Sequence, residues 1–294
     1  MELIMDWGVN VVLWFQQFSP ALDLPFAVFT FLGDEEFFLL LLPFVYWCLD
    51  RRTGARLTVL FLMSMLVNYV AKAIGAQPRP FQYDPRVLMI RDASGYGLPS
   101  GHTQSAVVVW GYLGSQFRKK WLWVVVALLV VLIPLSRVYL GVHFPHDLLG
   151  GYVLGAVSLA LFLWLDPRVE GGMSQQGLAW QLGLMALVPA LTIALSPSED
   201  SVTQGATLMS MGIGFILERR WVRFEPSPTW WKRLVAFLLG IVVVGGLWGG
   251  LRVAFDGLEP ALVFRFVRYG LTGLWGSLGA PWVFVRLRLA KTDR

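Results

Sequence analysis

Long apolar runs separated by short polar segments extend along most of the chain. Many runs approach the ~20 residues that a helix needs to cross the hydrocarbon core of a bilayer, and a helix satisfies its own backbone hydrogen bonds in lipid. The pattern predicts membrane-spanning helices at 37–49, 57–74, 102–117, 121–135, 148–165, 178–195, 202–217, 234–251 and 261–285.

Residues 1–33 fit this pattern less clearly. Asp6 and Gln16 interrupt the first apolar stretch, and Pro20 and Pro25 interrupt the second. We expect two helices that lie in the membrane interface with an apolar face, and a first span is the alternative.

Composition sets the fold class. Of the 294 residues, 56% are hydrophobic and only 15% are charged, with 14 Trp, and the mean hydropathy is +0.61. These values lie far from those of soluble domains and predict an all-α, polytopic transmembrane helical bundle. We expect three parts, namely N-terminal helices at 1–33, a core at 34–170 and additional C-terminal transmembrane helices at 171–294.

Positive charge predicts the orientation in the membrane. The formal net charge is +5, and most of the 24 Lys and Arg lie in or beside alternate loops, at 50–56, 118–120, 166–177, 218–233 and after 285. By the positive-inside rule these loops face the cytoplasm. Topology therefore explains the basic balance, and no nucleic-acid partner is expected.

The connection at 75–99 and a polar stretch at 136–147 then share the outer face. The stretch places an Arg, two His and an Asp between two apolar runs that contain no Lys, Arg, Asp or Glu. Ionisable groups at membrane depth are costly and are functional candidates by default. The three His of the chain, His102, His143 and His146, all lie in or near such polar gaps.

The order of residues within the stretch predicts a His–Asp pair. Pro145 suits the first turn of a helix, so we expect His143 just before that helix and Asp147 in its first turn. The carboxylate can then reach the imidazole and fix its tautomer, as in a Ser-His-Asp triad. We expect His146 to be a hydrogen-bonded neighbour without an assigned role.

Two more polar clusters lie on the same predicted face. Lys72 lies at the end of one span and Arg79 follows that span, while Ser100, Gly101 and His102 open another. Each has a structural alternative, because a terminal Lys often snorkels to the interface and a Ser before a helix is a common N-cap. Together the three clusters supply cations for phosphoryl oxygens, helix-start N–H groups for an anion, and two His for nucleophile and acid. This set indicates phosphoryl-transfer chemistry.

The three clusters resemble, in residue type, order and spacing, the signature motifs of the type 2 phosphatidic acid phosphatase superfamily, which includes lipid phosphate phosphatases. The resemblance covers about residues 36–165. The motif residues are Lys72, Arg79, Pro80, Pro99, Ser100, Gly101, His102, Ser136, Arg137, His143 and Asp147.

This resemblance implies a six-helix core and specific residue roles. It implies His143 as the nucleophile that forms phosphohistidine, Asp147 as the group that orients it, and His102 as the acid that protonates the leaving group. It also implies a phosphate pocket that needs no metal or other cofactor, made by Lys72, Arg79, Ser100, Gly101 and Arg137.

The resemblance implies an integral membrane phosphatase acting on a lipid phosphate or pyrophosphate. An isoprenoid pyrophosphate such as undecaprenyl pyrophosphate is the favoured substrate, followed by phosphatidate and long-chain-base phosphates. A lipid phosphotransferase with the same phosphohistidine, and a transport or lipid-binding protein, are the alternatives. We expect a bacterial inner or plasma membrane with the site on its outer face, and make no prediction of oligomeric state.

Two features lie outside the motifs. Residues 32–37 and 43–47 are loosely similar to the corresponding region of sphingosine-1-phosphate phosphatases. Asp34 could position the cationic pocket or, with the two Glu after it, start a helix, and the helix-start interpretation is favoured. Arg265 and Arg268 share one helix face and are expected to snorkel or pair internally, with a lipid headgroup as the alternative contact.

Overall fold

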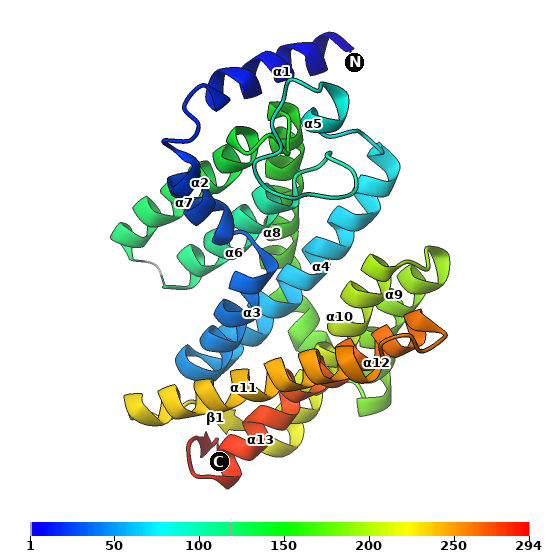
Figure 1. Ribbon diagram of the computed structural model, residues 1–294. Helices are drawn as coiled ribbons and strands as arrows, with labels where there is room; N and C mark the ends of the chain where they lie inside the picture. The colour runs from blue at the N-terminus through cyan, green and yellow to red at the C-terminus, as the bar shows by residue number, and fades with distance from the viewer. Residues whose placement is uncertain (1, 118, 294) are drawn as a thin grey trace. The chain divides into compact units, whose positions relative to one another are not determined.

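The computed structural model describes residues 2–117 and 119–293, so Arg118 and Arg294 of the predicted basic segments lie outside it. The described chain is mostly helical with very little strand, which confirms the predicted all-α class (Figure 1). Its two short strands, β1 (Phe224–Glu225) and β2 (Lys291–Thr292), pair antiparallel with Phe224 opposite Thr292.

Several helices have the length and composition of membrane spans. Among the described residues, five segments qualify, namely Arg51–Tyr83, Lys120–Tyr139, Pro145–Asp166, Leu178–Leu195 and Trp230–Ala254. The other predicted spans form shorter helices or helices with a π-helical segment. The chain is thus a multi-pass membrane protein.

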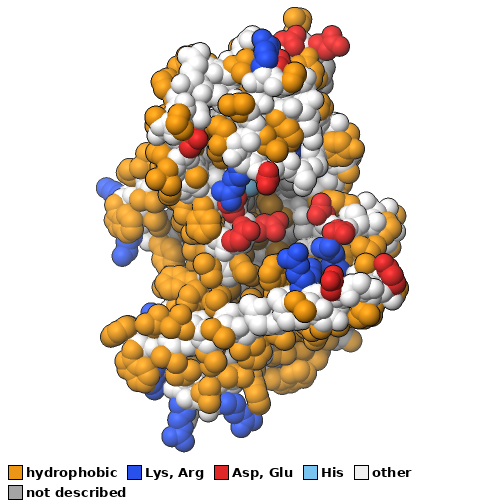
Figure 2. Space-filling model, viewed as in Figure 1, with side chains coloured by type: hydrophobic (Ala, Val, Ile, Leu, Met, Phe, Trp, Pro, Cys, Tyr) orange, Lys and Arg blue, Asp and Glu red, His pale blue; other side chains and the backbone are white. Residues whose placement is uncertain are grey.

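Apolar side chains cover much of the visible surface (Figure 2). On one helix, Leu149, Val153, Val157 and Leu161 recur every four residues and are 48–65% exposed. This spacing places them on one side of the helix. An exposed apolar stripe of this kind is expected where a helix faces lipid.

Contacts divide the chain into two compact units, each built from distant parts of the sequence. Unit 1 contains Met1–Phe38 and Val67–Leu165, and unit 2 contains Leu39–Leu66 and Asp166–Arg294. The predicted division at residues 34 and 171 stays a prediction.

Unit 1 holds α1 (Glu2–Gln16), α2 (Asp23–Phe31), the start of α3 (Glu35–Phe44), the end of α4 (Arg51–Gly75), α5 (Pro80–Tyr83), α6 (Gly101–Phe117), α7 (Lys120–Tyr139) and α8 (Pro145–Ser174) as far as Leu165. Unit 2 holds the remainder of α3, α4 and α8 with η1 (Val45–Leu49), α9 (Leu178–Leu195), α10 (Glu199–Leu217), η2 (Glu218–Val222), α11 (Trp230–Ala254), α12 (Ala261–Leu274), η3 (Trp275–Gly279), α13 (Ala280–Arg286) and both strands. The three η segments are π-helical.

In unit 1, α7 packs against α6, α2 and α1. The apolar positions Met5, Val9 and Val12 of α1 are buried in a cluster with Val138 and Phe144. Their spacing of four and three residues makes one helix face. The apolar face predicted for the N-terminal segment therefore packs on the protein, around the end of α7 and the start of α8.

The predicted loop at 50–56 is wrong in extent. Helix α4 already begins at Arg51, directly after η1. The physical reason is a cap, because the Thr53 backbone N–H donates to Asp50 Oδ1 at 2.6 Å and satisfies a free donor of the first turn. The basic residues of this segment thus lie on the first turns of a helix.

In unit 2, the Trp47 ring packs directly against the backbone of α11 at Gly240. Trp47 is 1% exposed, and its indole N–H donates to the Gly276 carbonyl at 3.0 Å. A Cβ added to Gly240 of α11 would lie 2.4 Å from Trp47 Cζ3, which is far inside van der Waals contact. Only glycine fits at this point.

We therefore predict that Gly240→Val destabilises the protein by about 1–3 kcal/mol, the usual cost of overpacking. Gly245→Val on the same helix is the matched control, because a Cβ there meets no atom within 4 Å. Thermal unfolding in detergent measures both. A Gly240→Val variant as stable as the control would contradict this packing.

Candidate active site

A buried His–Asp pair lies at the junction of α7 and α8. His143 Nδ1 donates to Asp147 Oδ2 at 3.1 Å, and the Phe144 backbone N–H donates to the same oxygen at 2.9 Å. His143 and Asp147 are 2% and 0% exposed. With the Nδ1 proton held by the carboxylate, the lone pair of the neutral imidazole is on Nε2.

Arg79 joins the 75–99 connection to this pair. Its guanidinium is 5% exposed and donates to the Val142 carbonyl at 2.8 Å, the Ser94 carbonyl at 2.7 Å and the Gly95 carbonyl at 3.1 Å. Arg79 Nη1 also lies 3.3 Å from His143 Nε2. The cation therefore lies beside the imidazole nitrogen that carries the lone pair.

Lys72 and Ser100 reach the same region from two other segments. Lys72 Nζ donates to the Tyr96 carbonyl at 2.7 Å, one residue after the Gly95 carbonyl that holds Arg79. The Ser100 backbone N–H donates to the Asp147 carbonyl at 3.0 Å. The Thr103 N–H donates to Ser100 Oγ at 3.4 Å, the N-cap contact expected from the sequence.

Arg137 lies in the last turn of α7 and is 5% exposed. Its Nη1 donates to Thr30 Oγ1 at 2.6 Å, while its backbone carbonyl accepts from the His143 N–H at 3.3 Å. Its Nε is buried and has no hydrogen-bond partner among the described residues. A buried unsatisfied guanidinium donor is unusual and is suited to an incoming anion.

His102, at the start of α6, pairs with an acidic residue from the N-terminal part. Its Nε2 lies 2.8 Å from Asp34 Oδ1, and Asp34 Oδ2 accepts from Arg91 Nη2 at 2.6 Å. Asp34 directly precedes α3, which has Glu35 and Glu36 in its first turn, and the Asp34 carbonyl accepts from the Phe38 N–H at 3.3 Å. The helix-start interpretation is therefore confirmed for this acidic segment, while the Asp34 side chain binds His102 and Arg91.

His146 is a neighbour of the pair. Its Nε2 donates to Gln77 Oε1 at 3.0 Å and lies 3.5 Å from Asp147 Oδ1. Its ring stacks on Phe144 with centroids 5.2 Å apart. His146 is thus a hydrogen-bonded neighbour of the pair, as expected from the sequence.

Burial lowers the pKa of His143 well below its usual value, and the positive charges of Lys72, Arg79 and Arg137 and the nearby His102 lower it further. Both causes disfavour the charged imidazolium. His143 is thus held neutral at neutral pH, the form that can act as a nucleophile.

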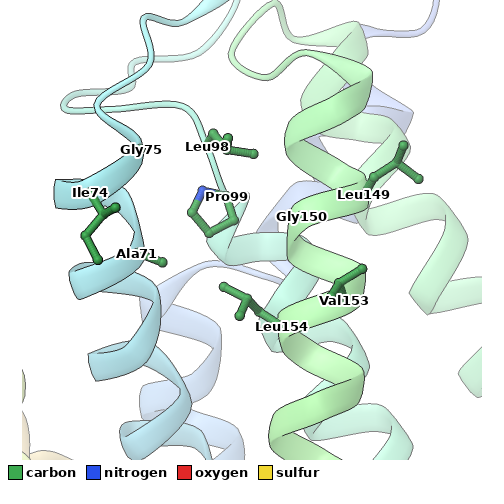
Figure 3. A pocket seen from close by; sticks show the side chains of 9 residues that line it. All are labelled: Ala71, Ile74, Gly75, Leu98, Pro99, Leu149, Gly150, Val153 and Leu154. Carbon is green, nitrogen blue, oxygen red and sulfur yellow. The ribbon is translucent and has the colours of Figure 1, made fainter.

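An apolar groove of about 490 Å³ adjoins these residues within unit 1 (Figure 3). Its walls come from the end of α4, the segment before α6 and the start of α8. The lining residues are Ala71, Ile74, Gly75, Leu98, Pro99, Leu149, Gly150, Val153 and Leu154. Three of them adjoin site residues in sequence, because Ala71 precedes Lys72, Pro99 precedes Ser100, and Leu149 follows Asp147 by two positions.

The residues predicted from the three motifs therefore converge within unit 1, while the sequence interpretation missed the contacts of Thr30, Arg91 and Gln77. Within the described ranges, no group of three or more His, Cys, Asp or Glu is placed to hold a metal ion.

A buried His–Asp pair surrounded by cations in an apolar helical protein is an arrangement suited to an anion in a membrane protein. The family model described as PAP2 superfamily matches residues 53–170, and the model described as PAP2 superfamily phosphatase, transmembrane extension, matches residues 202–292. The chain belongs to the type 2 phosphatidic acid phosphatase, or PAP2, superfamily, which confirms the resemblance.

Curated relatives carry different names. Sphingosine-1-phosphate phosphatase 2 of Mus musculus is 35% identical over 137 residues, which are 44% of this chain and 38% of the relative. Undecaprenyl-diphosphatase of Sulfolobus acidocaldarius is 34% identical over 108 residues, 36% of this chain and 52% of the relative. Bacitracin transport permease protein BcrC of Bacillus licheniformis is 31% identical over 148 residues, 48% of this chain and 71% of the relative. The chain spans less than two thirds of the first two relatives.

In unit 2, Arg265 and Arg268 of α12 each contact another residue of the protein. Arg265 forms an ion pair with Glu199 and lies 3.5 Å from Thr203 Oγ1. The Arg268 guanidinium lies 4.8 Å from the Tyr269 ring centroid. For Arg265 this is the internal pairing expected from the sequence.

The lowered pKa of His143 generates a direct test. The chain has three His, so selective isotope labelling gives a simple NMR spectrum, and His143→Ala assigns the signal. In phosphate-free buffer we expect His143 to stay neutral at pH 6, where an ordinary imidazole with a pKa of about 6.5 is mostly protonated.

Lys72→Gln removes one of the cations that lower this pKa, so the His143 titration midpoint should move to higher pH. Lys120→Gln, at the opposite end of α7 from Arg137, is the matched control and should leave the midpoint unchanged. A wild-type midpoint at or above about 6.5 would show that burial and the cations do not lower the pKa of this imidazole.

Proposed function

We propose that the chain is an integral membrane phosphatase that hydrolyses a lipid phosphate or pyrophosphate through a phosphohistidine at His143. The observation that carries the proposal is the hydrogen-bonded series from Asp147 through His143 to Arg79. It combines a nucleophile with its lone pair on Nε2, a carboxylate that fixes the tautomer and a cation for the phosphoryl oxygens.

In the first step, His143 Nε2 attacks phosphorus while the bond from phosphorus to the leaving oxygen breaks. Lys72, Arg79 and Arg137 stabilise the charge on the phosphoryl oxygens, with Ser100 and Gly101 at the helix start completing the pocket. When Nε2 attacks, its lone pair no longer accepts from the Arg79 Nη1–H group. That N–H group can then donate a hydrogen bond to a phosphoryl oxygen. His102 gives its proton to the leaving oxygen.

In the second step, water attacks the phosphohistidine and His102 takes the proton from that water. The phosphorus–nitrogen bond breaks, inorganic phosphate forms, and His143 returns to its neutral state. Asp147 stabilises the imidazole when it carries positive charge during transfer.

The apolar groove beside Pro99 supports an amphiphilic substrate, whose hydrocarbon chain would lie there while its phosphate meets the cations. An isoprenoid pyrophosphate, such as undecaprenyl pyrophosphate, is the favoured substrate. The name of the Sulfolobus acidocaldarius relative supports this choice. Long-chain-base phosphates and phosphatidate come next, and the name of the Mus musculus relative supports the first of these two.

We place the site on the outer face of a bacterial inner or plasma membrane, because the basic loops predict the opposite face as cytoplasmic.

The alternative activity is phosphotransfer, in which an acceptor alcohol replaces water in the second step. A phosphate-release panel with and without such an alcohol separates the two, because a transferase forms a new phosphoester. A transport or lipid-binding protein would release no phosphate.

We predict that His143→Ala abolishes phosphate release and that EDTA leaves the wild-type rate unchanged. Brief reaction with a ³²P-labelled substrate should label the wild type with an acid-labile, alkali-stable phosphate. His146→Gln is the control, since its imidazole lies outside the proposed series, and it should retain labelling. Full turnover by His143→Ala, or inactivation by chelation, would refute the mechanism.

The groove generates a second prediction. Val153→Trp narrows it and should lower kcat/KM for a long-chain phosphate about tenfold, since excluding about two methylenes costs ~1.6 kcal/mol. A short, water-soluble phosphate should react at the wild-type rate. Val157→Trp, one turn further along α8 on the exposed stripe, is the matched control. Equal effects of both variants would show that the hydrocarbon chain of the substrate does not lie in this groove.

A further inference from the structure

We infer that Asp34 is a positioning residue for His102, so that the proposed site contains two His–Asp pairs rather than one. The inference rests on the proposed function. The segment before α3, which lies outside all three motifs, would then take part in protonating the leaving group.

The geometry of this second pair is as close as that of the first. Asp34 Oδ1 lies 2.8 Å from His102 Nε2, compared with 3.1 Å between Asp147 and His143. Asp34 is 8% exposed. A buried carboxylate at hydrogen-bond distance from an imidazole orients the ring and selects its tautomer.

Gly33, the residue before Asp34, allows this segment to lie close to His102. A Cβ at Gly33 would lie 2.9 Å from His102 Cδ2 and 2.8 Å from Ile133 Cγ2, so a side chain there would push the segment away from the imidazole. Thr30, three residues earlier, accepts the hydrogen bond from Arg137 at 2.6 Å. The short segment from Thr30 to Asp34 therefore contacts both the proposed acid and one of the phosphate-binding cations.

The ionisation of Asp34 suits the role. Burial alone would raise its pKa, but the hydrogen bond with His102 and the positive charges of His102, Arg91 and Arg137 outweigh burial and hold the pKa below its usual range. Asp34 is thus a carboxylate at neutral pH and accepts the Nε2 proton of His102. With the Nε2 proton held by Asp34, Nδ1 carries a transferable proton when His102 is in its imidazolium form, which the charge of a bound phosphate dianion favours.

In the reaction, this proton moves from His102 Nδ1 to the leaving oxygen as the phosphorus–oxygen bond breaks. The negative charge of Asp34 stabilises His102 in its protonated form before transfer and keeps Nδ1, rather than Nε2, as the donor. Loss of the carboxylate should therefore slow only reactions whose leaving group needs a proton.

Leaving-group dependence tests this directly. The two substrates are dodecyl phosphate, which expels a strongly basic alkoxide, and p-nitrophenyl phosphate, which expels a weakly basic phenolate. Asp34→Asn should lower kcat/KM about 100-fold for the alkyl phosphate and less than about 3-fold for the aryl phosphate, in line with the worth of general acid catalysis. The ratio of the two rates does not depend on the fraction of protein that is folded.

Two control variants separate this role from a general effect of local charge. Glu36→Gln removes an exposed carboxylate two positions away and should leave both rates unchanged. Arg91→Gln breaks the 2.6 Å ion pair with Asp34 but keeps the carboxylate, so the ratio should stay close to the wild-type value. His102→Gln is the benchmark and should reproduce the selective loss.

An equal or complete loss on both substrates, or no loss, in Asp34→Asn would overturn the inference, as would a selective loss in Arg91→Gln. Failure of the proposed function has a different signature. In that case His143→Ala keeps its turnover, or His102→Gln affects both substrates equally.

Discussion

The structure of the site depends on how one buried cation is held. Arg79 is almost completely buried and reaches backbone carbonyls on both sides of the site, from Ser94 and Gly95 in one segment and Val142 in another. A guanidinium away from water is costly unless its N–H groups are satisfied. The same contacts that satisfy it bring the long connection before α6 against the turn that carries His143.

The motifs predicted most of this site because each includes residues whose local geometry is set by nearby sequence. Pro145 starts α8 and Asp147 lies in its first turn, so the pair with His143 is a consequence of helix geometry. Ser100 before α6 is an N-cap for the same kind of reason. Such contacts between near neighbours can be read from spacing alone.

The contacts that were missed join residues far apart in the chain. Asp34 and His102 are separated by 68 positions, and Arg137 and Thr30 by 107. At Asp34 the local signal, an acid before two Glu and an apolar run, is also that of a helix start. Only the fold, with Gly33 allowing the approach to His102, shows that the Asp34 side chain has a second role. The early end of the loop before α4 was missed because the Asp50 cap precedes a run of basic residues that is typical of a loop.

The manner in which the cations are held has a consequence for selectivity. Arg79 and Lys72 donate to backbone carbonyls and Arg137 to a hydroxyl. At these contacts the acceptors are neutral, so they satisfy N–H groups without cancelling positive charge. A phosphate monoester is mostly a dianion at neutral pH, whereas a sulfate monoester of nearly the same shape is a monoanion. For the proposed activity, this arrangement favours a phosphorylated lipid over a sulfated one by the number of charges each carries rather than by its shape.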